Sequence, residues 1–294
     1  MQNLKIGPGA HGSFLGSMGN YSCADAVIIG APMDYTVSFR PGSRMGPGII
    51  REMSLVLETY SPHLDGDLED VALFDHGDLE LVFGNVEKSL EIIYDAAEQV
   101  FADGKLPIFL GGEHLISLPV IKAAYNKYGS ELVLFHFDAH TDLRKEYMGE
   151  DMSHATVIRR CMDFMEGSSI YQFGIRSGLG EEFQLGRQRT NFYPFEVTEP
   201  LEMAVKEIGD RPLYVTLDID VVDPAYAPGT GTPEPGGCTS MEILQAAHLF
   251  GGCNLIGMDI VEVMGYGDPA GITGVLAAKI LREVLIAVSK GKRR

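Results

Sequence analysis

One stretch of the sequence decides the fold: LVLFHFDAHTD, residues 132–142. It begins as an apolar run of strand length, rich in valine, leucine and phenylalanine. It ends in Asp138, His140 and Asp142, three ionisable groups at alternate positions. Buried carboxylates are costly unless a cation or a metal pairs with them, and two carboxylates with an imidazole make half of a site for a divalent metal. The stretch therefore predicts a buried strand that ends at a metal site.

Two other apolar runs end in the same way. Residues 106–110 are followed by Gly-Gly-Glu-His, and residues 213–217 are followed by Asp-Ile-Asp. Ligands of open parallel α/β sheets bind just beyond the carboxyl ends of the strands, so we expect the three endings to converge on a dinuclear site. The competing interpretation is three acidic loops that only solvate strand ends. The candidate ligands are His114, Asp138, His140, Asp142, Asp218 and Asp220.

Strand-like and helix-like segments alternate along the rest of the chain. This alternation predicts a three-layer α/β/α fold, with a mostly parallel sheet of about eight strands and helices on both faces. We find no linker, composition break or internal repeat, so residues 1–294 predict a single domain, with an N-terminal arm rich in Gly, Ser and Asn over residues 1–22. The expected strands are 26–29, 71–74, 106–110, 132–137, 170–174, 192–195, 213–217 and 255–260. The expected helices are 47–57, 86–101, one from about 117, 153–165, 201–208, 239–250 and 273–288.

The overall charge bears on the partners of the protein. The formal net charge is −18, and an acidic surface repels phosphate backbones, so we expect no nucleic-acid partner. The same charge suits a cationic substrate, although acidity also aids solubility. No apolar run is long enough to span a bilayer, and the N-terminus has no signal-peptide pattern. The four cysteines have irregular spacings and no C-x-x-C pair, which is typical of reduced thiols in a cytoplasmic protein.

The chemistry of the candidate ligands indicates a hydrolase. They are oxygen-rich with two imidazoles and no thiolate, which suits Mn²⁺ better than a structural Zn²⁺. Two metals that share carboxylates can hold one hydroxide between them at neutral pH. From this chemistry alone, the substrate could be a phosphoester, an amide or an amidine.

Several motifs resemble the ureohydrolases, the arginase and agmatinase family. They are Gly111-Gly112-Glu113-His114, Asp138-Ala139-His140-Thr141-Asp142, Ser153-His154 and Asp218-Ile219-Asp220-Val221-Val222-Asp223-Pro224. Residues 227–233 and 40–44 are similar to the agmatinase branch, and the resemblance runs from about residue 25 to the C-terminus. A dinuclear phosphoesterase would be expected to carry a Gly-Asn-His motif, which this sequence lacks.

The resemblance implies a fold and an activity. The fold would be arginase/deacetylase-like, and the reaction would be the hydrolysis of agmatine to putrescine and urea, as in polyamine biosynthesis. Two Mn²⁺ per subunit would be the cofactors, and the chain would form a homo-oligomer, a trimer or a hexamer.

The resemblance also implies roles for single residues. One metal would be held by His114, Asp138, Asp142 and Asp218, and the other by Asp138, His140, Asp218 and Asp220. Asp142 would also carry a proton to the leaving amine. Glu262 would bind the guanidinium by paired charge-assisted hydrogen bonds, and His154 would be a proton shuttle.

Each of these roles has a simpler competitor. His154 could cap the helix that begins there, and Glu262 could be a surface carboxylate at a strand end. Glu113 fits a supporting or helix-capping role and is not expected to be a ligand. His136 lies on the same side of its strand as Asp138, and we expect it to be a buried, hydrogen-bonded histidine.

One departure from the family pattern bears on the substrate. Arginases have an asparagine where this chain has Arg144, which argues against arginine as the substrate. Arg144 would repel the ammonium of agmatine if it faced the pocket, whereas a carboxylate-tailed guanidine such as 4-guanidinobutyrate would welcome it. The alternatives to an agmatinase are therefore a guanidinobutyrase or another guanidino-acid ureohydrolase and, from another class, a catalytically silent relative that acts as a binding protein.

Overall fold

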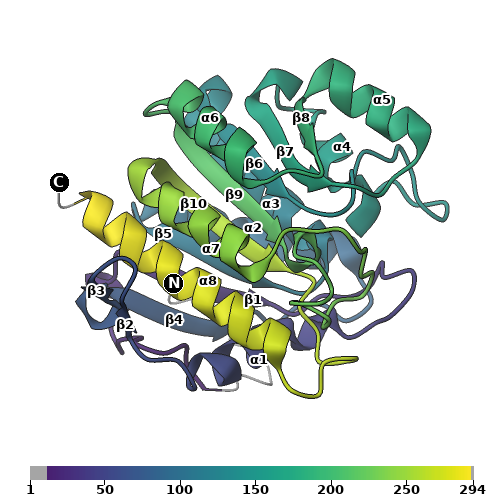
Figure 1. Cartoon of the computed structure of the whole chain (residues 1–294). Helices are drawn as coiled ribbons and strands as arrows, with labels where there is room; N and C mark the ends of the chain where they lie inside the picture. Colours follow the sequence, from purple (N-terminus) through teal and green to yellow (C-terminus); the bar gives the residue numbers. More distant parts are fainter. Residues whose placement is uncertain (1–11, 293–294) are drawn as a thin grey trace.

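The computed structural model describes residues 12–292, and its centre is one eight-stranded sheet (Figure 1). All the strand pairings of this sheet are parallel. The strands lie in the order β4-β1-β5-β10-β9-β6-β7-β8. Their bounds are β1 Ala26–Ala31, β4 Leu73–Asp78, β5 Leu106–Gly111, β6 Val133–Phe137, β7 Ile170–Ile175, β8 Asn191–Pro194, β9 Pro212–Asp218 and β10 Asn254–Val261.

Helices cover both faces of this sheet, which gives three layers. One face packs against α1 (Gly46–Ser54), α6 (Thr198–Ile208), α7 (Ser240–Leu249) and α8 (Ile272–Lys292), which lie in front of the sheet in Figure 1. The other face packs against α2 (Val86–Ala102), α3 (Ser117–Tyr128), α4 (Val157–Cys161) and α5 (Gly180–Arg189). Alternate side chains of β1 belong to the two apolar clusters, Ile28 to one and Val27 and Ile29 to the other, as the two-residue period of a strand requires. The predicted three-layer α/β/α fold is therefore confirmed.

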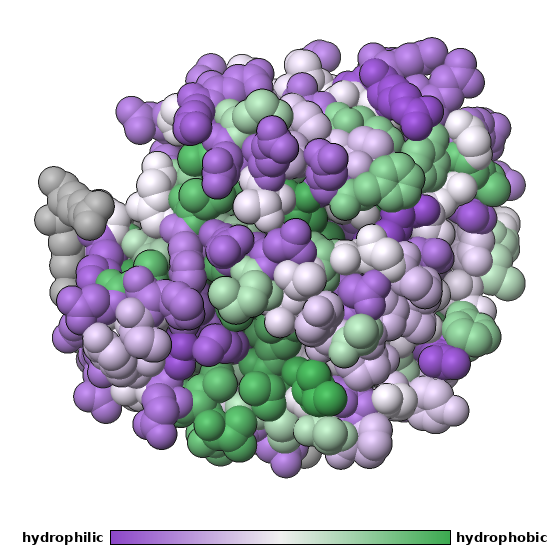
Figure 2. Space-filling view, in the orientation of Figure 1, coloured by the Kyte–Doolittle hydropathy of each residue, from purple (hydrophilic) through white to green (hydrophobic). Residues whose placement is uncertain are grey.

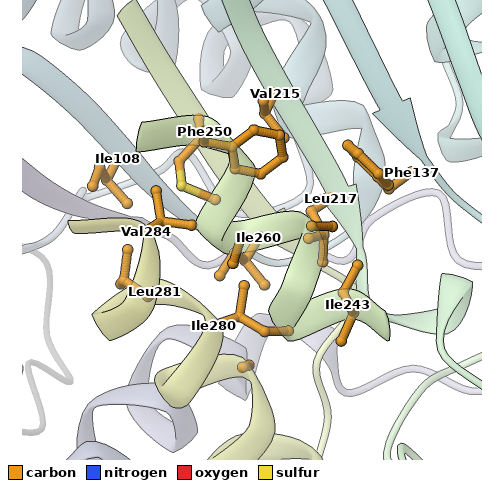
Figure 3. Packing of buried hydrophobic residues seen from close by; sticks show 14 of the residues in the cluster. Ile108, Phe137, Val215, Leu217, Ile243, Phe250, Ile260, Ile280, Leu281 and Val284 are labelled. Carbon is orange, nitrogen blue, oxygen red and sulfur yellow. The ribbon is translucent and has the colours of Figure 1, made fainter. Parts of the chain in front are cut away.

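The apolar layer under α7 and α8 holds the central strands in place. Complete burial of one large aliphatic or aromatic side chain contributes roughly 1.5–3 kcal/mol, so this layer is a large share of the stability of the sheet. Figure 3 shows Phe137, Val215, Leu217 and Ile260 of the strands facing the helix side chains Ile243, Ile280, Leu281 and Val284, with Phe250 between them.

The expected strands all exist, but two helical regions differ from the expectation. The helix expected over 153–165 is only the short turn His154–Thr156 followed by α4, Val157–Cys161. Helix α5 was not expected, because its sequence GEEFQLGRQR has few apolar residues and no helical apolar stripe. A two-stranded hairpin of β2 (Tyr60–Ser61) and β3 (Gly66–Asp67) was also not expected, since its strands are too short for an apolar pattern.

The N-terminal segment lies only partly within the described residues. Residues 1–11 of the predicted arm fall outside them. Most of residues 12–22 are exposed, but Phe14 is only 2% exposed and its N–H donates to Asp75 Oδ2 at 2.8 Å. The N–H of Met18 donates to the carbonyl of Leu73 at 2.7 Å. This part of the chain therefore packs along β4.

On the face shown in Figure 2, hydrophilic residues predominate, and a hydrophobic area lies over α1 and the start of α8. Among residues 12–292, no helix combines the length and the apolar character that crossing a bilayer requires. The four cysteines are free thiols, as expected.

Candidate metal centre

The strand order brings the predicted endings together at one edge of the sheet. Strands β5, β10, β9 and β6 are consecutive neighbours and parallel, so their carboxyl ends meet. His114 follows β5, Asp138 follows β6, Asp218 ends β9 and Glu262 follows β10. The predicted convergence is therefore present, because the three segments that carry the six candidate ligands meet at this edge.

A first ligand set forms around His114. Its Nδ1 lies 3.0 Å from Asp138 Oδ2, 3.1 Å from Asp142 Oδ2 and 3.5 Å from Asp218 Oδ2. These four residues are the ones expected for the first metal, and all of them are buried. One nitrogen that faces three carboxylate oxygens at such distances is an arrangement that a cation stabilises.

A second ligand set forms around His140. Its Nδ1 lies 3.0 Å from Asp220 Oδ2 and 3.5 Å from Asp138 Oδ1. Asp138 therefore presents Oδ2 to the first set and Oδ1 to the second, as a bridging carboxylate must. The side chain of Asp218 was expected to bridge as well, and this remains a prediction. Its Oδ2 faces His114 at 3.5 Å, and its Oδ1 accepts the N–H of Asp220 at 2.8 Å, as Asp138 Oδ1 accepts the N–H of His140 at 2.5 Å.

The residues behind His114 determine which nitrogen carries its proton. The Nε2 of His114 lies 2.9 Å from the hydroxyl of Thr216, which donates to Asp259 Oδ1 at 2.7 Å. The hydroxyl of Tyr214 donates to the other oxygen of Asp259, also at 2.7 Å. Because the proton of Thr216 is directed to Asp259, Nε2–H of His114 donates to Thr216. Nδ1 then faces the carboxylates. Burial opposes the charged ring, but hydrogen bonds to these carboxylates outweigh it and raise the pKa of His114 well above its ordinary value, so a bound metal would take the place of a proton on Nδ1.

Several buried polar atoms lack hydrogen-bond partners among the described residues. They include His114 Nδ1, Asp142 Oδ2 and Asp220 Oδ2. Buried orphan atoms need an explanation, and these three belong to the two ligand sets. Burial and neighbouring carboxylates also raise the pKa of Asp218 well above its ordinary value and raise that of Asp220. Divalent cations among these atoms would favour the ionised carboxylates, so the donor set fits two such cations.

His136 belongs to the group around His114 that could hold a metal ion, and both of its ring nitrogens have hydrogen-bond partners. Thr190 donates to Gln172 Oε1 at 3.0 Å, which fixes the orientation of that amide. The amide nitrogen of Gln172 then donates to His136 Nδ1 at 3.1 Å, so the proton of His136 is on Nε2. This Nε2–H donates to Asp138 Oδ2 at 2.9 Å. The expectation of a buried, hydrogen-bonded histidine is confirmed, and its partner is the bridging carboxylate.

Glu113 and Thr36 hold His154 against the site. Glu113 is fully buried and accepts hydrogen bonds from the N–H of Thr36 at 2.8 Å and from its hydroxyl at 2.6 Å. The hydroxyl of Thr36 accepts the N–H of His154 at 3.0 Å, and its oxygen lies 3.3 Å from His154 Nδ1. The cap of the following helical turn is Ser153, so the simpler reading of His154 as a helix cap is wrong. Burial lowers the pKa of His154, which keeps its ring neutral at pH 7.

Glu262 is also buried at the centre. It is 8% exposed, and its Oε1 accepts the N–H of His114 at 2.8 Å, so it is not a surface carboxylate. Burial and the neighbouring Glu113 raise the pKa of Glu262 to about 8, and a cation beside it would favour its ionised form. The backbone of both Glu262 and Asp142 is left-handed, with φ of 62° and 51°, a strained conformation that is common at functional sites.

A cavity of about 280 Å³ opens onto both ligand sets. Its wall contains His154 and Glu262 and three side chains that were not expected to act as a group, namely Arg144, Tyr147 and Glu182. Glu182 could not have been placed from the sequence, because it lies on the unexpected helix α5. Arg144 was considered as a pocket residue, and the structure places it there.

Comparisons with known proteins agree with this architecture. A family model described as the arginase family matches residues 24–287. The agmatinase of Bacillus subtilis is 48% identical over 280 residues, which cover 94% of this chain and 96% of that protein. A guanidinobutyrase of Pseudomonas aeruginosa is 34% identical and covers 92% and 88%. The crystal structure of the agmatine ureohydrolase of Thermoplasma volcanium has a TM-score of 0.87 at 33% identity and covers 96% of this chain and 95% of that one. The chain therefore belongs to the arginase family.

Proposed function

We propose that the protein is a ureohydrolase that hydrolyses agmatine to putrescine and urea with two Mn²⁺ ions. The observation that carries the proposal is the shared carboxylate of Asp138, which contacts both ligand sets at the floor of one cavity. The identity to agmatinases over nearly the whole chain supports the choice of substrate. The all-oxygen and imidazole donor set supports Mn²⁺.

The two ions would be held by the His114 set and the His140 set. When bound, a pair of divalent cations supplies a hydroxide nucleophile near neutral pH and stabilises negative charge on the reacting atoms.

The residues of the chain supply the remaining steps. Glu262 binds the guanidinium group and turns its carbon toward the centre, because an ionised carboxylate accepts two guanidinium N–H bonds in one plane. Asp142 accepts a proton from the attacking water and passes it to the leaving amine.

His154 transfers a further proton between the reacting groups and solvent. If Nδ1–H donates to the hydroxyl of Thr36, as the 3.3 Å distance allows, Nε2 is left to take up and release protons. A neutral ring is needed for the uptake, and burial provides it at pH 7.

A guanidinobutyrase is the second candidate, and one observation favours it. The cationic side chain of Arg144 lies on the wall of the cavity, where it would attract a carboxylate tail. A catalytically silent binding protein is the candidate from another class, and the complete set of ligands and Glu262 count against it.

A urea assay with Mn²⁺ on agmatine, arginine and 4-guanidinobutyrate tests these alternatives. We expect urea from agmatine at the highest rate. Urea only from 4-guanidinobutyrate would establish the second candidate, and urea from arginine alone would contradict the argument from Arg144. If Mn²⁺ binds and no guanidine gives urea, the protein is a silent relative.

We also propose a cytoplasmic homo-oligomer of three or six copies, which the family resemblance supports. Light scattering after gel filtration measures the mass of the assembly. A monomeric mass of about 32.0 kDa in an active preparation would contradict this proposal.

A further inference from the structure

Two opposite charges face each other on the wall of the catalytic cavity. The Nε of Arg144 lies 3.5 Å from Oε1 of Glu182, and both residues line the cavity. The side chain of Glu182 is 3% exposed and that of Arg144 is 31% exposed. The carboxylate is therefore the buried member of the pair, and the guanidinium is the member that reaches water and any ligand in the cavity.

The carboxylate of Glu182 is held in place by its own helix. It lies in the first turn of α5 (Gly180–Arg189), where negative charge is favourable. Its Oε2 accepts the backbone N–H of Leu179, and a hydrogen bond from Thr141 reaches the same carboxylate. Because these two donors hold the carboxylate of Glu182, we expect it to keep its position when a substrate occupies the cavity.

The guanidinium of Arg144 is held on its other side by an aromatic ring. Its central carbon lies 4.5 Å from the centre of the Tyr147 ring, a cation–π distance. The backbone N–H of Arg144 donates to the carbonyl of Ala155 at 3.3 Å. Arg144 is therefore fixed between Tyr147 and Glu182 and does not swing freely into solvent.

This pairing resolves the conflict between an arginine in the pocket and a cationic substrate. Alone, Arg144 would attract a carboxylate tail and repel an ammonium tail. With Glu182 at 3.5 Å, the pair has no net charge, and the net charge of −18 on the whole chain then favours the cation.

We propose that Arg144 and Glu182 form a selectivity pair, in which Glu182 cancels the charge of Arg144 and so allows a cationic tail at the far end of the substrate. This inference rests on the proposed ureohydrolase function and deepens it. It makes Glu182 a specificity-determining residue. It predicts that the preference shifts toward the anionic tail when only Glu182 is neutral and toward the cationic tail when only Arg144 is neutral.

The test compares agmatine with 4-guanidinobutyrate, two guanidines of similar length whose tails carry opposite charges. The measured quantity is the selectivity, defined as kcat/KM for agmatine divided by kcat/KM for 4-guanidinobutyrate. The variants are Glu182→Gln, Arg144→Gln and the double variant. Glutamine keeps an oxygen that can accept the N–H of Leu179, so the start of α5 is retained.

The single variants should change the selectivity in opposite directions. Glu182→Gln leaves the positive charge of Arg144 without its partner. The selectivity should fall by about tenfold or more, because one charge–charge interaction between Arg144 and the substrate tail at a partly hydrated site has an effect of about this size. Arg144→Gln leaves the carboxylate uncancelled and should raise the selectivity by a similar factor. The double variant has a neutral wall again and should return to within about threefold of the wild-type value.

Two neighbouring residues provide matched controls. Glu181→Gln removes the same charge from the same helical turn, and Lys145→Gln removes a positive charge beside Arg144; both side chains are exposed. Neither control should change the selectivity more than about twofold, because exposed charges are screened. If Glu182→Gln does not fold, Arg144→Gln alone carries the test, since Arg144 caps no helix.

The outcomes separate the selectivity pair from the proposed function. Equal losses on both substrates in both single variants would show that the pair is only structural and would overturn the inference, while the ureohydrolase function would stand. A wild-type protein that binds Mn²⁺ and releases urea from neither substrate would overturn the proposed function and this inference with it.

Discussion

The substitution Thr216→Val tests whether Thr216 determines which ring nitrogen of His114 carries the proton. Valine has nearly the shape of threonine but no hydroxyl, so the packing of β9 is retained. The change removes the acceptor of His114 Nε2–H at 2.9 Å and the donor to Asp259 Oδ1 at 2.7 Å. The proton of His114 is then free to move to Nδ1, which would block the nitrogen that faces the carboxylates.

Two magnitudes follow from this loss. Removing the group that orients a metal-binding histidine typically costs 10–100-fold in metal affinity. We therefore expect the Kd for Mn²⁺ at the site that contains His114 to rise by about that factor. The buried N–H of His114 and one oxygen of Asp259 lose a partner, which costs about 1–3 kcal/mol of unfolding free energy. Asp259 keeps its hydrogen bond from Tyr214, which places the expected loss toward the lower end.

The assay is calorimetric titration of the metal-free protein with Mn²⁺, with urea denaturation in a chelator as the measure of stability. Tyr214→Phe is the matched control, because it removes the other donor to Asp259 and leaves the contact of His114 intact. The control should lose stability without losing much metal affinity. If Thr216→Val binds Mn²⁺ as tightly as the wild type, or if both variants lose the same affinity, the orienting role of Thr216 is wrong.

Three other changes probe the proton carriers and the buried charges. Asp142→Asn should lower the rate of urea formation about 10²–10⁴-fold, and a variant with full activity would show that Asp142 carries no proton. Thr36→Val should lower kcat and change the pH–rate profile because His154 loses its support, whereas Thr36→Ser keeps the hydroxyl and should keep both; identical profiles for the two would contradict this. Glu283→Gln should destabilise the metal-free protein at pH 7 by about 1–3 kcal/mol. Burial opposes the ionised form of Glu283, but hydrogen bonds from Ser61, Arg282 and His248 outweigh it and lower the pKa. Its stabilisation is therefore present above the ordinary pKa of 4.5 and is lost as the pH falls through the lower folded value. The deficit measured by denaturation should therefore shrink as the pH falls below 4.5, and a constant deficit would refute the charge argument.

The sheet was predictable because its strands are buried on both faces. Runs such as residues 133–137 and 213–217 are mostly apolar, interrupted by His136 and Thr216 respectively, and this pattern can be seen without knowing which strands lie beside them. The site was predictable for a related reason. Polar residues that directly follow buried strands must meet at one edge of a parallel sheet, so His114, Asp138 and Asp218 could be placed together before any contact was known.

The parts that escaped prediction depend on partners far away in the sequence. Glu182 reaches the cavity from a helix without an apolar stripe, and nothing local marks it as different from the exposed Glu181.

Proton placement at the site follows from polar groups that the fold buries at some cost. Thr216 and Asp259 direct the proton of His114, and Gln172 directs that of His136. Buried polar groups destabilise a sheet unless all of them are paired, and an apolar replacement would satisfy packing equally well. Their value lies in the direction that they give to the imidazole rings: Nδ1 of His114 faces the carboxylates, and Nε2–H of His136 donates to the shared carboxylate of Asp138. The polar residues behind the ligands therefore fix the orientation in which the imidazoles meet the carboxylates.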